Sequence, residues 1–550
     1  MENFDNKKIL KKRLLIFGSL ATIFFFILGF RLYFIQIYKN PIYSEEALKQ
    51  RGKEISLYPK RGIIYDRNLT PFTNIKNTQN IILSNKILKN NKHMLDIVLE
   101  HSTLSRYEIL NLLNLDDEII KIPLKDNIRI DNKPEDVFVV DVVERYTDKN
   151  ILSHVIGYVN KKDNYGESGI EKVFDEFLKN SEKRSFFVEF DKDRSMILGG
   201  SEFVNEITDS MDPTGVKLTI DYRIQESVEK ILDENNINGA AIVVEVDTGK
   251  IMALASRPNY DQENIEYYLD TKDMALYNKA IQVGYPPGSI FKTVVLLTAI
   301  EEDLLGKEYH CKGYEDIKNV RIKCTSVHGD ISLKEGFEKS CNSVFIQLGK
   351  ELGGKKIIEM AERLNFGSKI NIGLLEEISG NLPKGNDLLG PAIGNISIGQ
   401  GKIEVTPLQI ANLMTIIANR GLQKHLTLIE GITNKDGIII KEYNREDDKR
   451  VLSESSSELA MEYLNSVVEN GTGKDLDLYE VGGSGGKTGS AEAIMNKNST
   501  IHGWFAGYFP KDNSKYVITV LVEGGHSGSK SAAPIFEKIA KEINKIYPVY

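Results

Sequence analysis

The feature that most constrains this chain is an uncharged apolar run near its start. Residues Leu14 to Phe30 read LLIFGSLATIFFFILGF, and the apolar character continues beyond Arg31 into LYFIQIY. About 20 apolar residues are enough to cross a lipid bilayer as a helix. A cleaved signal peptide is the alternative, but its apolar core is usually shorter and ends at small residues, whereas Phe and Tyr surround the end of this run. We therefore predict an uncleaved membrane anchor over residues 14–38.

Positive charge next to the anchor predicts its orientation. Five basic residues precede the apolar run: Lys7, Lys8, Lys11, Lys12 and Arg13. Segments rich in Lys and Arg stay on the cytoplasmic side of a membrane. We therefore expect residues 1–13 to form a cytoplasmic tail of a single-pass protein of the cell membrane, with the bulk of the chain outside the cell.

The rest of the composition is that of a globular protein. A length of 550 residues allows two or more domains. Hydrophobic residues make up 41% and charged residues 27%, which is ordinary for a folded domain. The net charge of −8 is spread along the chain. A nucleic-acid-binding face needs clustered Lys and Arg, so we expect no nucleic-acid partner.

A change in the sequence pattern near residue 215 predicts a domain boundary. Residues 39–215 mix short apolar runs with polar turns, which favours an irregular α+β region. The stretch TDSMDPTG, Thr208 to Gly215, consists largely of turn formers and reads as a linker. Beyond it, AAIVVEV and KIMALAS flank a DTG turn over residues 240–256 and predict a β-hairpin.

Strands and helices are expected to alternate through the C-terminal part. HGWFAGYFP, residues 502–510, and KYVITVLVEGG, residues 515–525, predict a second strand pair. APIFEKIAKEINKI, residues 533–546, is apolar at every third or fourth position and predicts a closing helix. Strands at both ends with helices between them indicate an α/β domain with an antiparallel sheet.

GYPPGSIFKTVVLLTAI, Gly284 to Ile300, places one lysine inside an apolar run. Ser289 and Lys292 lie three residues apart, so a helix starting near Ser289 would put both on one face. A serine hydroxyl is a poor nucleophile until a base removes its proton. Burial lowers the pKa of a lysine below its reference value of about 10.4. A buried Lys292 would therefore serve as that base, whereas a surface lysine on an amphipathic helix is the ordinary alternative.

Two further stretches bear on whether Ser289 and Lys292 act as a nucleophile and its base. SLKEGFEKSCNSVFIQLGKELGG begins with a capping box from Ser332 to Glu335, and it predicts two helical pieces interrupted at Ser340, Cys341 and Asn342. GGSGGKTGSAEA, Gly482 to Ala493, leads from a glycine-rich turn into Lys487, Thr488, Gly489 and Ser490. A polar helix face and a flexible loop are the ordinary interpretations of these two stretches.

Together the three motifs resemble a known family. Ser-x-x-Lys, Ser-x-Asn and Lys-Thr-Gly, in this order, are typical of penicillin-binding proteins and class A β-lactamases. RGIIYDRN, Arg61 to Asn68, and GESGIEKVFDEFL, Gly166 to Leu178, resemble motifs of the class B penicillin-binding proteins. SIGQGKIEVTPLQIANLMTIIANRG, Ser397 to Gly421, also resembles class B transpeptidase sequence.

The resemblance implies an α/β (α+β) fold and a domain plan. A transpeptidase domain of the serine β-lactamase type, with an antiparallel sheet flanked by helices, would span residues 216–550. An irregular α+β pedestal and dimerisation domain would span residues 39–215, after the one transmembrane helix. The implied activity is that of a serine-type D-Ala-D-Ala transpeptidase, which cross-links peptidoglycan stem peptides and is acylated by β-lactams.

The resemblance also implies the role of each site residue. Ser289 would attack the carbonyl of the penultimate D-Ala while Lys292 takes its proton. Ser340 would pass a proton to the departing D-Ala, Asn342 would hold the donor peptide, and Lys487 would supply positive charge. Thr488, Gly489 and Ser490 would bind the substrate and its terminal carboxylate. Backbone N–H groups of Ser289 and Ser490 would form the oxyanion hole.

The three cysteines raise a separate question. Cys311, Cys324 and Cys341 lie within 31 residues of one another, and with His328 they offer a Cys₃His set for structural zinc. A disulfide with one free thiol and plain buried cysteines are the alternatives, and His310 is an alternative fourth ligand. Because neighbouring side chains of an extended segment point to opposite sides, we expect Cys341 to point away from Ser340 and Asn342. Some class B enzymes carry zinc beside Ser-x-Asn, and this segment resembles theirs.

Two rival functions stay open at this point. A β-lactamase or β-lactam sensor would use the same chemistry, although no water-positioning glutamate is identified in the sequence. A non-catalytic cell-wall scaffold would act through a SEDS-family glycosyltransferase, which is the partner that the resemblance implies. We expect no catalytic cofactor and a role in elongation or sporulation.

Overall fold

The computed structural model describes all residues except 1, 41–42, 44–51, 58–60, 115–118, 126–127, 131–132, 135, 162, 180–182, 191–195, 207–210, 272, 496–497 and 550. The start of the predicted linker, residues 208–210, lies outside the described residues. The chain divides into two compact units. One comprises Met1–Pro59, Asn77–Val143 and Lys183–Ile207, and the other comprises Lys60–Lys76, Glu144–Glu182 and Thr208–Tyr550.

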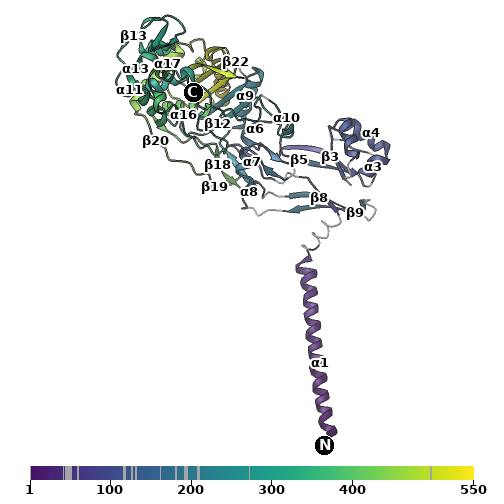
Figure 1. The fold of residues 1–550 in the computed structure, drawn as a ribbon. Helices are drawn as coiled ribbons and strands as arrows, with labels where there is room; N and C mark the ends of the chain where they lie inside the picture. The colour runs from purple at the N-terminus through teal and green to yellow at the C-terminus, as the bar shows by residue number, and fades with distance from the viewer. Residues whose placement is uncertain are drawn as a thin grey trace. The chain divides into compact units, whose positions relative to one another are not determined.

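The first unit begins with the predicted anchor. Helix α1 spans Glu2–Tyr33 and continues as a π-helical turn over Phe34–Tyr38 (Figure 1). The segment Lys7–Tyr38 is long and apolar enough to cross a membrane. Large side chains such as Phe25 and Phe26 are 70% and 79% exposed. Such a helix fits a single-pass membrane anchor, because its exposed apolar surface would face lipid tails.

Two small sheets and a group of helices complete the first unit. Strands β1 (Gly52–Ser56), β8 (Lys183–Phe190) and β9 (Met196–Glu206) form one sheet, and β4 (Ile119–Pro123), β3 (Lys76–Ser84) and β5 (Phe138–Glu144) form the other. Residues Ile81 and Leu83 of β3 pack on α3 (Asn85–Asn90), α4 (Lys92–His101) and α5 (Arg106–Asn114). The intervening Ile82 packs with residues of β1 and β8. The alternation of side chains along a strand thus serves two cores, as expected of an α+β region.

A five-stranded antiparallel sheet organises the second unit. Its order is β12-β11-β23-β22-β21. The strands are β11 (Gly239–Glu245), β12 (Ile251–Arg257), β21 (Gly485–Met495), β22 (Asn498–Phe509) and β23 (Tyr516–Val522). The predicted hairpin is therefore confirmed as β11–β12 and the predicted strand pair as β22–β23.

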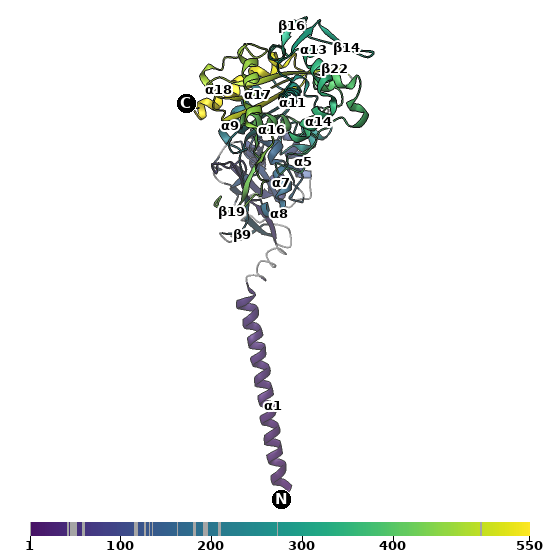
Figure 2. The same ribbon diagram turned by 90° about the vertical axis from the view of Figure 1, so that its left-hand side faces the viewer.

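Helices cover both faces of this sheet (Figures 1 and 2). Helices α9 (Tyr222–Glu234) and α18 (Ala533–Ile546) pack on one face, against Val243, Phe505 and Ile518 among others. Helices α11 (Lys292–Glu301), α16 (Pro407–Ala418) and α17 (Glu454–Glu469) share the core of the other face with Ile242 and Trp504. The closing helix spans the predicted residues, because its apolar positions recur at the helical period.

Shorter elements surround this core. Helices α12 (Leu333–Glu338) and α13 (Asn342–Leu352) contact two ribbons, β13 (Glu308–Cys311) with β16 (Gly329–Ser332), and β14 (Tyr314–Ile317) with β15 (Val320–Lys323). Helices α14 (Gly354–Arg363) and α15 (Ala392–Ser397) contact α13. A separate sheet has the order β19 (Ile439–Glu442), β18 (Ile429–Thr433), β10 (Gly215–Leu218), β2 (Ile64–Tyr65). The remaining pieces are β6 (Val159–Asn160), β7 (Tyr165–Gly166), β17 (Leu422–Gln423), β20 (Lys449–Arg450), α6 (Ser153–Ile156), α7 (Gly169–Val173), α8 (Asp175–Leu178) and α10 (Ile265–Leu269).

A buried ion network holds two N-terminal motifs inside the second unit. Glu171 is fully buried and binds both Arg61 and Arg145, with nitrogen–oxygen distances of 2.7 Å. Arg61 also binds Asp175 at 2.7 Å, and Tyr146 donates to Glu171 at 3.1 Å. A buried carboxylate of this kind is stable only while its cationic partners remain. Because these motifs belong to the second unit, residues 39–215 are divided between the two units.

Candidate active site

Ser289 lies on a tight turn that leads directly into a buried helix. Residues Gly288–Phe291 form a 3₁₀ turn, and α11 begins at Lys292, three residues after the serine. Side chains three residues apart eclipse one another in a 3₁₀ turn. Ser289 and Lys292 therefore share one face, as the sequence predicted.

Two glycines bring this turn against strand β21. Gly288 has φ of +52°, and a Cβ placed there would lie 2.7 Å from the carbonyl oxygen of Ser490. A Cβ at Gly489 would lie 3.0 Å from the carbonyl oxygen of Pro287. On the other side, the Trp504 indole donates to the Pro286 carbonyl at 3.1 Å. The nucleophile turn and the Lys-Thr-Gly strand are thus in backbone contact, which larger residues would prevent.

Lys292 is buried and turned toward the Ser-x-Asn turn. Its side chain has no exposed surface. Its Nζ donates to the Ser340 carbonyl at 2.7 Å, to Asn342 Oδ1 at 2.8 Å and to Ser340 Oγ at 3.3 Å. Burial lowers the pKa of Lys292 to about 8, although electrostatic interaction with Cys341 and Cys324 offsets part of this shift. The group is therefore within reach of the neutral state near neutral pH.

Lys487 meets the same hydroxyl from strand β21. It is also fully buried, and its Nζ donates to Ser340 Oγ at 3.1 Å and to the Thr488 carbonyl at 3.2 Å. Burial, and then repulsion by Lys292, holds the pKa of Lys487 well below its ordinary value. One serine hydroxyl thus bridges two amines that repel each other when both are protonated.

The Ser-x-Asn turn has the interruption that the sequence predicted. Helix α12 begins with the capping box of Ser332 and Glu335 and is followed by α13 from Asn342. Ser340 adopts φ of +52°, a left-handed conformation that is uncommon for a non-glycine residue and is often found at functional sites. Cys341 is buried behind the turn, while Ser340 and Asn342 contact Lys292.

The remaining predicted substrate-binding residues lie along the same strand. Thr488 is 6% exposed, and its Oγ1 lies 2.6 Å from Thr472 Oγ1. The hydroxyl of Ser490 accepts a hydrogen bond from the backbone N–H of Gly528 at 3.1 Å, so its own proton can still be donated. Sequence reasoning missed Thr472, because its motif NGTG reads as an ordinary turn.

The structure brings the predicted polar residues of the three motifs into one region. Lys292, Ser340, Asn342 and Lys487 form one hydrogen-bonded cluster, while Thr488 and Ser490 continue along the strand beside the Ser289 turn. The cluster offers a hydroxyl, two bases with lowered pKa and an amide. A nucleophile with an adjacent base is the arrangement needed for covalent acyl transfer.

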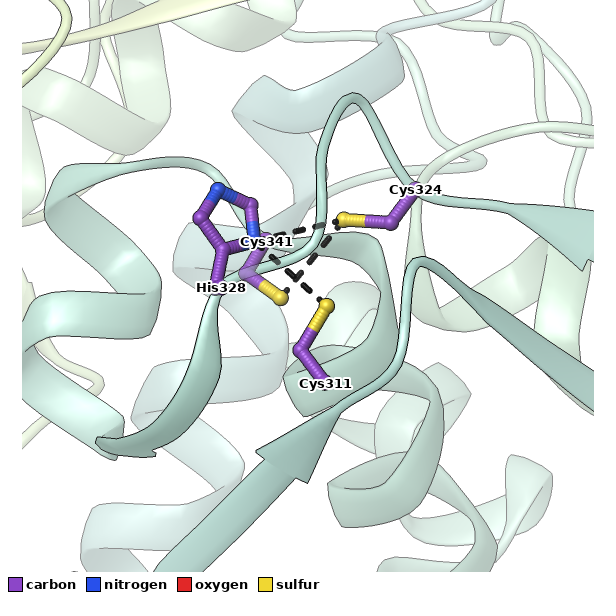
Figure 3. A group of neighbouring side chains, drawn as sticks. All are labelled: Cys311, Cys324, His328 and Cys341. Carbon is purple, nitrogen blue, oxygen red and sulfur yellow. Dashed lines mark hydrogen bonds between the residues drawn. The ribbon is translucent and has the colours of Figure 1, made fainter.

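The cysteines and His328 converge at a second site (Figure 3). Their ligand atoms all lie within 4.8 Å of one another. The His328 Nδ1 lies 3.4 Å from Cys311 Sγ and 3.6 Å from Cys324 Sγ, and the Cys324 and Cys341 sulfurs are 3.6 Å apart. All three cysteines are free, without a disulfide.

The three shortest of these distances fit a tetrahedral zinc ion. Zn–S bonds of about 2.3 Å and Zn–N bonds of about 2.0 Å place neighbouring ligand atoms about 3.5 to 3.8 Å apart. His328 Nε2 lies 2.9 Å from Ser326 Oγ, which leaves Nδ1 free for a metal when Nε2 carries the proton. His310 lies outside this set, since it pairs with Asp330 at 2.6 Å. Of the two histidines considered from the sequence, the structure places His328 with the cysteines.

The cysteine site contacts the Ser-x-Asn turn directly. The backbone N–H of Asn342 donates to Cys324 Sγ at 3.3 Å, and the Asn342 side chain donates to the Lys323 carbonyl at 3.0 Å. Cys311 and Cys324 flank the β14–β15 ribbon, and Cys341 lies between Ser340 and Asn342. A metal held here would therefore fix the residues that contact Lys292.

Comparison with known proteins agrees with this geometry. Residues 239–541, more than half of the chain, match the family model described as the penicillin binding protein transpeptidase domain. Stage V sporulation protein D of Bacillus subtilis is 26% identical, covering 97% of this chain and 85% of the relative. The peptidoglycan D,D-transpeptidase MrdA of Acinetobacter baumannii is 25% identical, covering 99% and 90%.

A solved structure shows the same fold. Penicillin-binding protein 2 from Helicobacter pylori has a TM-score of 0.68 at 22% identity, covering 90% of this chain and 100% of that chain. The fold class expected from the sequence is confirmed. From its matched domain, its fold and its full-length relatives, the chain belongs to the penicillin-binding protein transpeptidase family, as a class B member.

Proposed function

We propose that the chain is a membrane-anchored peptidoglycan D,D-transpeptidase in which Ser289 is the nucleophile. The observation that carries the proposal is the Ser340 hydroxyl, held between two fully buried lysines beside the Ser289 turn. Buried amines with lowered pKa values are costly to keep in a fold. A catalytic role explains them, because an amine with a lowered pKa can accept a serine proton and return it.

In the acylation step, neutral Lys292 takes the Ser289 proton as the serine oxygen attacks the carbonyl carbon of the penultimate D-Ala. The bond to the terminal D-Ala nitrogen then breaks, and Ser340 passes a proton to that leaving amine and regains one from Lys292. An amine of a second stem peptide attacks the ester and loses a proton to Lys292, which returns it to the departing Ser289 oxygen. The energy comes from the peptide bond that is broken, so no nucleotide is needed.

Neighbouring residues bind and orient the donor peptide. Asn342 binds the backbone of the donor peptide, while Thr488, Gly489 and Ser490 bind its terminal carboxylate. Lys487 supplies positive charge beside it when protonated, a form that the negative charge of the carboxylate favours. The backbone N–H groups of Ser289 and Ser490 stabilise the oxyanion, and losing one such donor typically lowers the rate about 10²- to 10³-fold.

Zinc bound by Cys311, Cys324, Cys341 and His328 would have a structural role. When all four positions are filled by protein, the ion supplies folding energy and leaves no open position to activate water. The four residues then fix the ribbon β14–β15 and the turn at Ser340 relative to each other. No catalytic cofactor is part of the proposal.

Membrane placement and partners extend the same proposal. The basic residues at the start of α1, before its apolar run, favour a cytoplasmic tail over residues 1–13, with a pedestal and dimerisation domain over residues 39–215 and the transpeptidase domain over residues 216–550 outside the cell. A SEDS-family glycosyltransferase would supply the glycan strands. Helicobacter pylori penicillin-binding protein 2, a fold neighbour, has been solved as a complex with MreC. The Bacillus subtilis relative supports a sporulation role.

One experiment separates this function from its rivals. Purified full-length protein is given a stem pentapeptide and an acceptor amine, and release of D-alanine with formation of the cross-linked product is measured. The Ser289→Ala variant should give no product, and cells that depend on the protein should not survive with it. A short-lived penicillin adduct without cross-linking would identify a β-lactamase. Full complementation by Ser289→Ala would identify a scaffold.

A further inference from the structure

Thr472 lies where three parts of the active site meet. It follows α17, and its backbone N–H donates to the Glu338 carbonyl at the end of α12, at 3.1 Å. A Cβ at the preceding Gly471 would lie 2.5 Å from that same carbonyl. Gly473 donates back to the Val467 carbonyl at 3.0 Å. These contacts fix the backbone on both sides of Thr472 and so limit the positions that its side chain can take.

That side chain meets Thr488 on the Lys-Thr-Gly strand. The two Oγ1 atoms lie 2.6 Å apart, a normal distance for a hydroxyl–hydroxyl hydrogen bond. Two hydroxyls carry two protons, and their mutual bond uses one. The other proton is then available to an outside acceptor. With a carboxylate beside Thr488, the favoured chain runs from Thr472 to Thr488 to the carboxylate, because consecutive hydrogen bonds polarise one another.

We propose that Thr472 is a positioning residue for substrate-carboxylate recognition: its hydroxyl donates to Thr488 and so directs the Thr488 proton toward the carboxylate of the D-alanyl terminus or of a penicillin. This inference rests on the proposed binding role of Thr488. Thr472 acts only through Thr488 and takes no part in the acyl transfer.

The experiment measures acylation of the full-length protein in detergent by a fluorescent penicillin and by the methyl ester of that penicillin. The ester lacks the negative charge that the hydroxyl chain is proposed to recognise. Thr472→Val keeps the shape and removes the hydroxyl, and Thr472→Ser restores it. Thr415→Val, which removes a buried hydroxyl that donates to the Ala411 carbonyl on α16, is the matched control. Thermal melting is recorded for each variant.

Thr472→Val should lower the acylation efficiency for the acid about two- to tenfold, the worth of one neutral hydrogen bond, through weaker initial binding. Its efficiency for the ester should not change. Thr472→Ser should restore the acid, and Thr415→Val should leave both reagents unaffected. Thr472→Ala gives the same test if the valine variant does not fold.

Two results would overturn the inference. Equal losses for acid and ester in the Thr472 variants would mean a purely structural role. An unchanged preference for the acid in Thr472→Val, with a lost preference in Thr488→Val, would mean that Thr488 recognises the carboxylate without Thr472. If Thr488→Val also keeps the preference, the proposed binding role of Thr488 fails first, and the inference fails with it.

Discussion

Replacing Gly288 by alanine tests whether the contact between the nucleophile turn and strand β21 sets the reactivity of Ser289. Gly288 has φ of +52°, where a residue with a Cβ is disfavoured by about 1–2 kcal/mol. The new Cβ would lie 2.7 Å from the Ser490 carbonyl oxygen and would have to move by about 0.7 Å to reach an ordinary contact of 3.4 Å. Displacements of about 1 Å can cost about 10²-fold in rate. We therefore expect acylation by penicillin to slow about ten- to a hundredfold.

Gly385→Ala is the matched control for this change. Gly385 has φ of +56° and also begins a 3₁₀ turn, but a Cβ there would meet nothing within 4 Å. In thermal melting both variants should lose stability from the backbone conformation, and Gly288→Ala should lose more because of its contact with Ser490. Only Gly288→Ala should lose acylation rate in stopped flow. If Gly288→Ala acylates as fast as the wild type, the reasoning from this contact is wrong.

Three other perturbations have defined outcomes. Burial lowers the pKa of Lys292 to about 8, and only its neutral form accepts a proton, so the acylation rate should rise with pH through about 8; a flat or falling profile would exclude Lys292 as the base. Zinc analysis should find one ion per chain, and a strong chelator or Cys341→Ser should lower the melting temperature and slow acylation; purified, reduced protein without zinc would contradict this. Glu171→Gln leaves two buried guanidinium groups without their shared carboxylate and should cost about 3 kcal/mol or more in unfolding free energy, whereas Glu176→Gln, at an exposed position of α8, should cost little; equal melting temperatures would refute the role of the ion network.

Local patterns in the sequence predicted the parts of the fold that depend on near neighbours. The β11–β12 hairpin, the capping box at Ser332 and the closing helix follow from turn residues, hydrogen-bonding side chains and apolar periodicity within a few positions. Local pattern also favours a buried Lys292, because apolar residues surround it in the sequence.

Contacts between distant segments were not predictable in the same way. The Thr472–Thr488 contact depends on how α17 ends against α12 and β21, and nothing in the motif NGTG reports that packing. The ion network around Glu171 joins residues far apart in the sequence, such as Arg61 and Glu171, and local patterns along the chain do not reveal it. Motif resemblance pointed to the candidate catalytic residues, but the convergence of Lys292 and Lys487 on Ser340 Oγ is a property of the folded chain.

The most direct test of the account is the location and rate of the penicillin adduct. Full-length protein treated with penicillin is measured by intact mass, and the modified peptide is mapped, for the wild type and for Lys292→Met. We expect one adduct per chain on Ser289 in the wild type and almost none in the variant on the same time scale, with equal melting temperatures. An adduct on another residue, or an undiminished rate in Lys292→Met, would contradict the claim that a buried, neutral Lys292 activates Ser289.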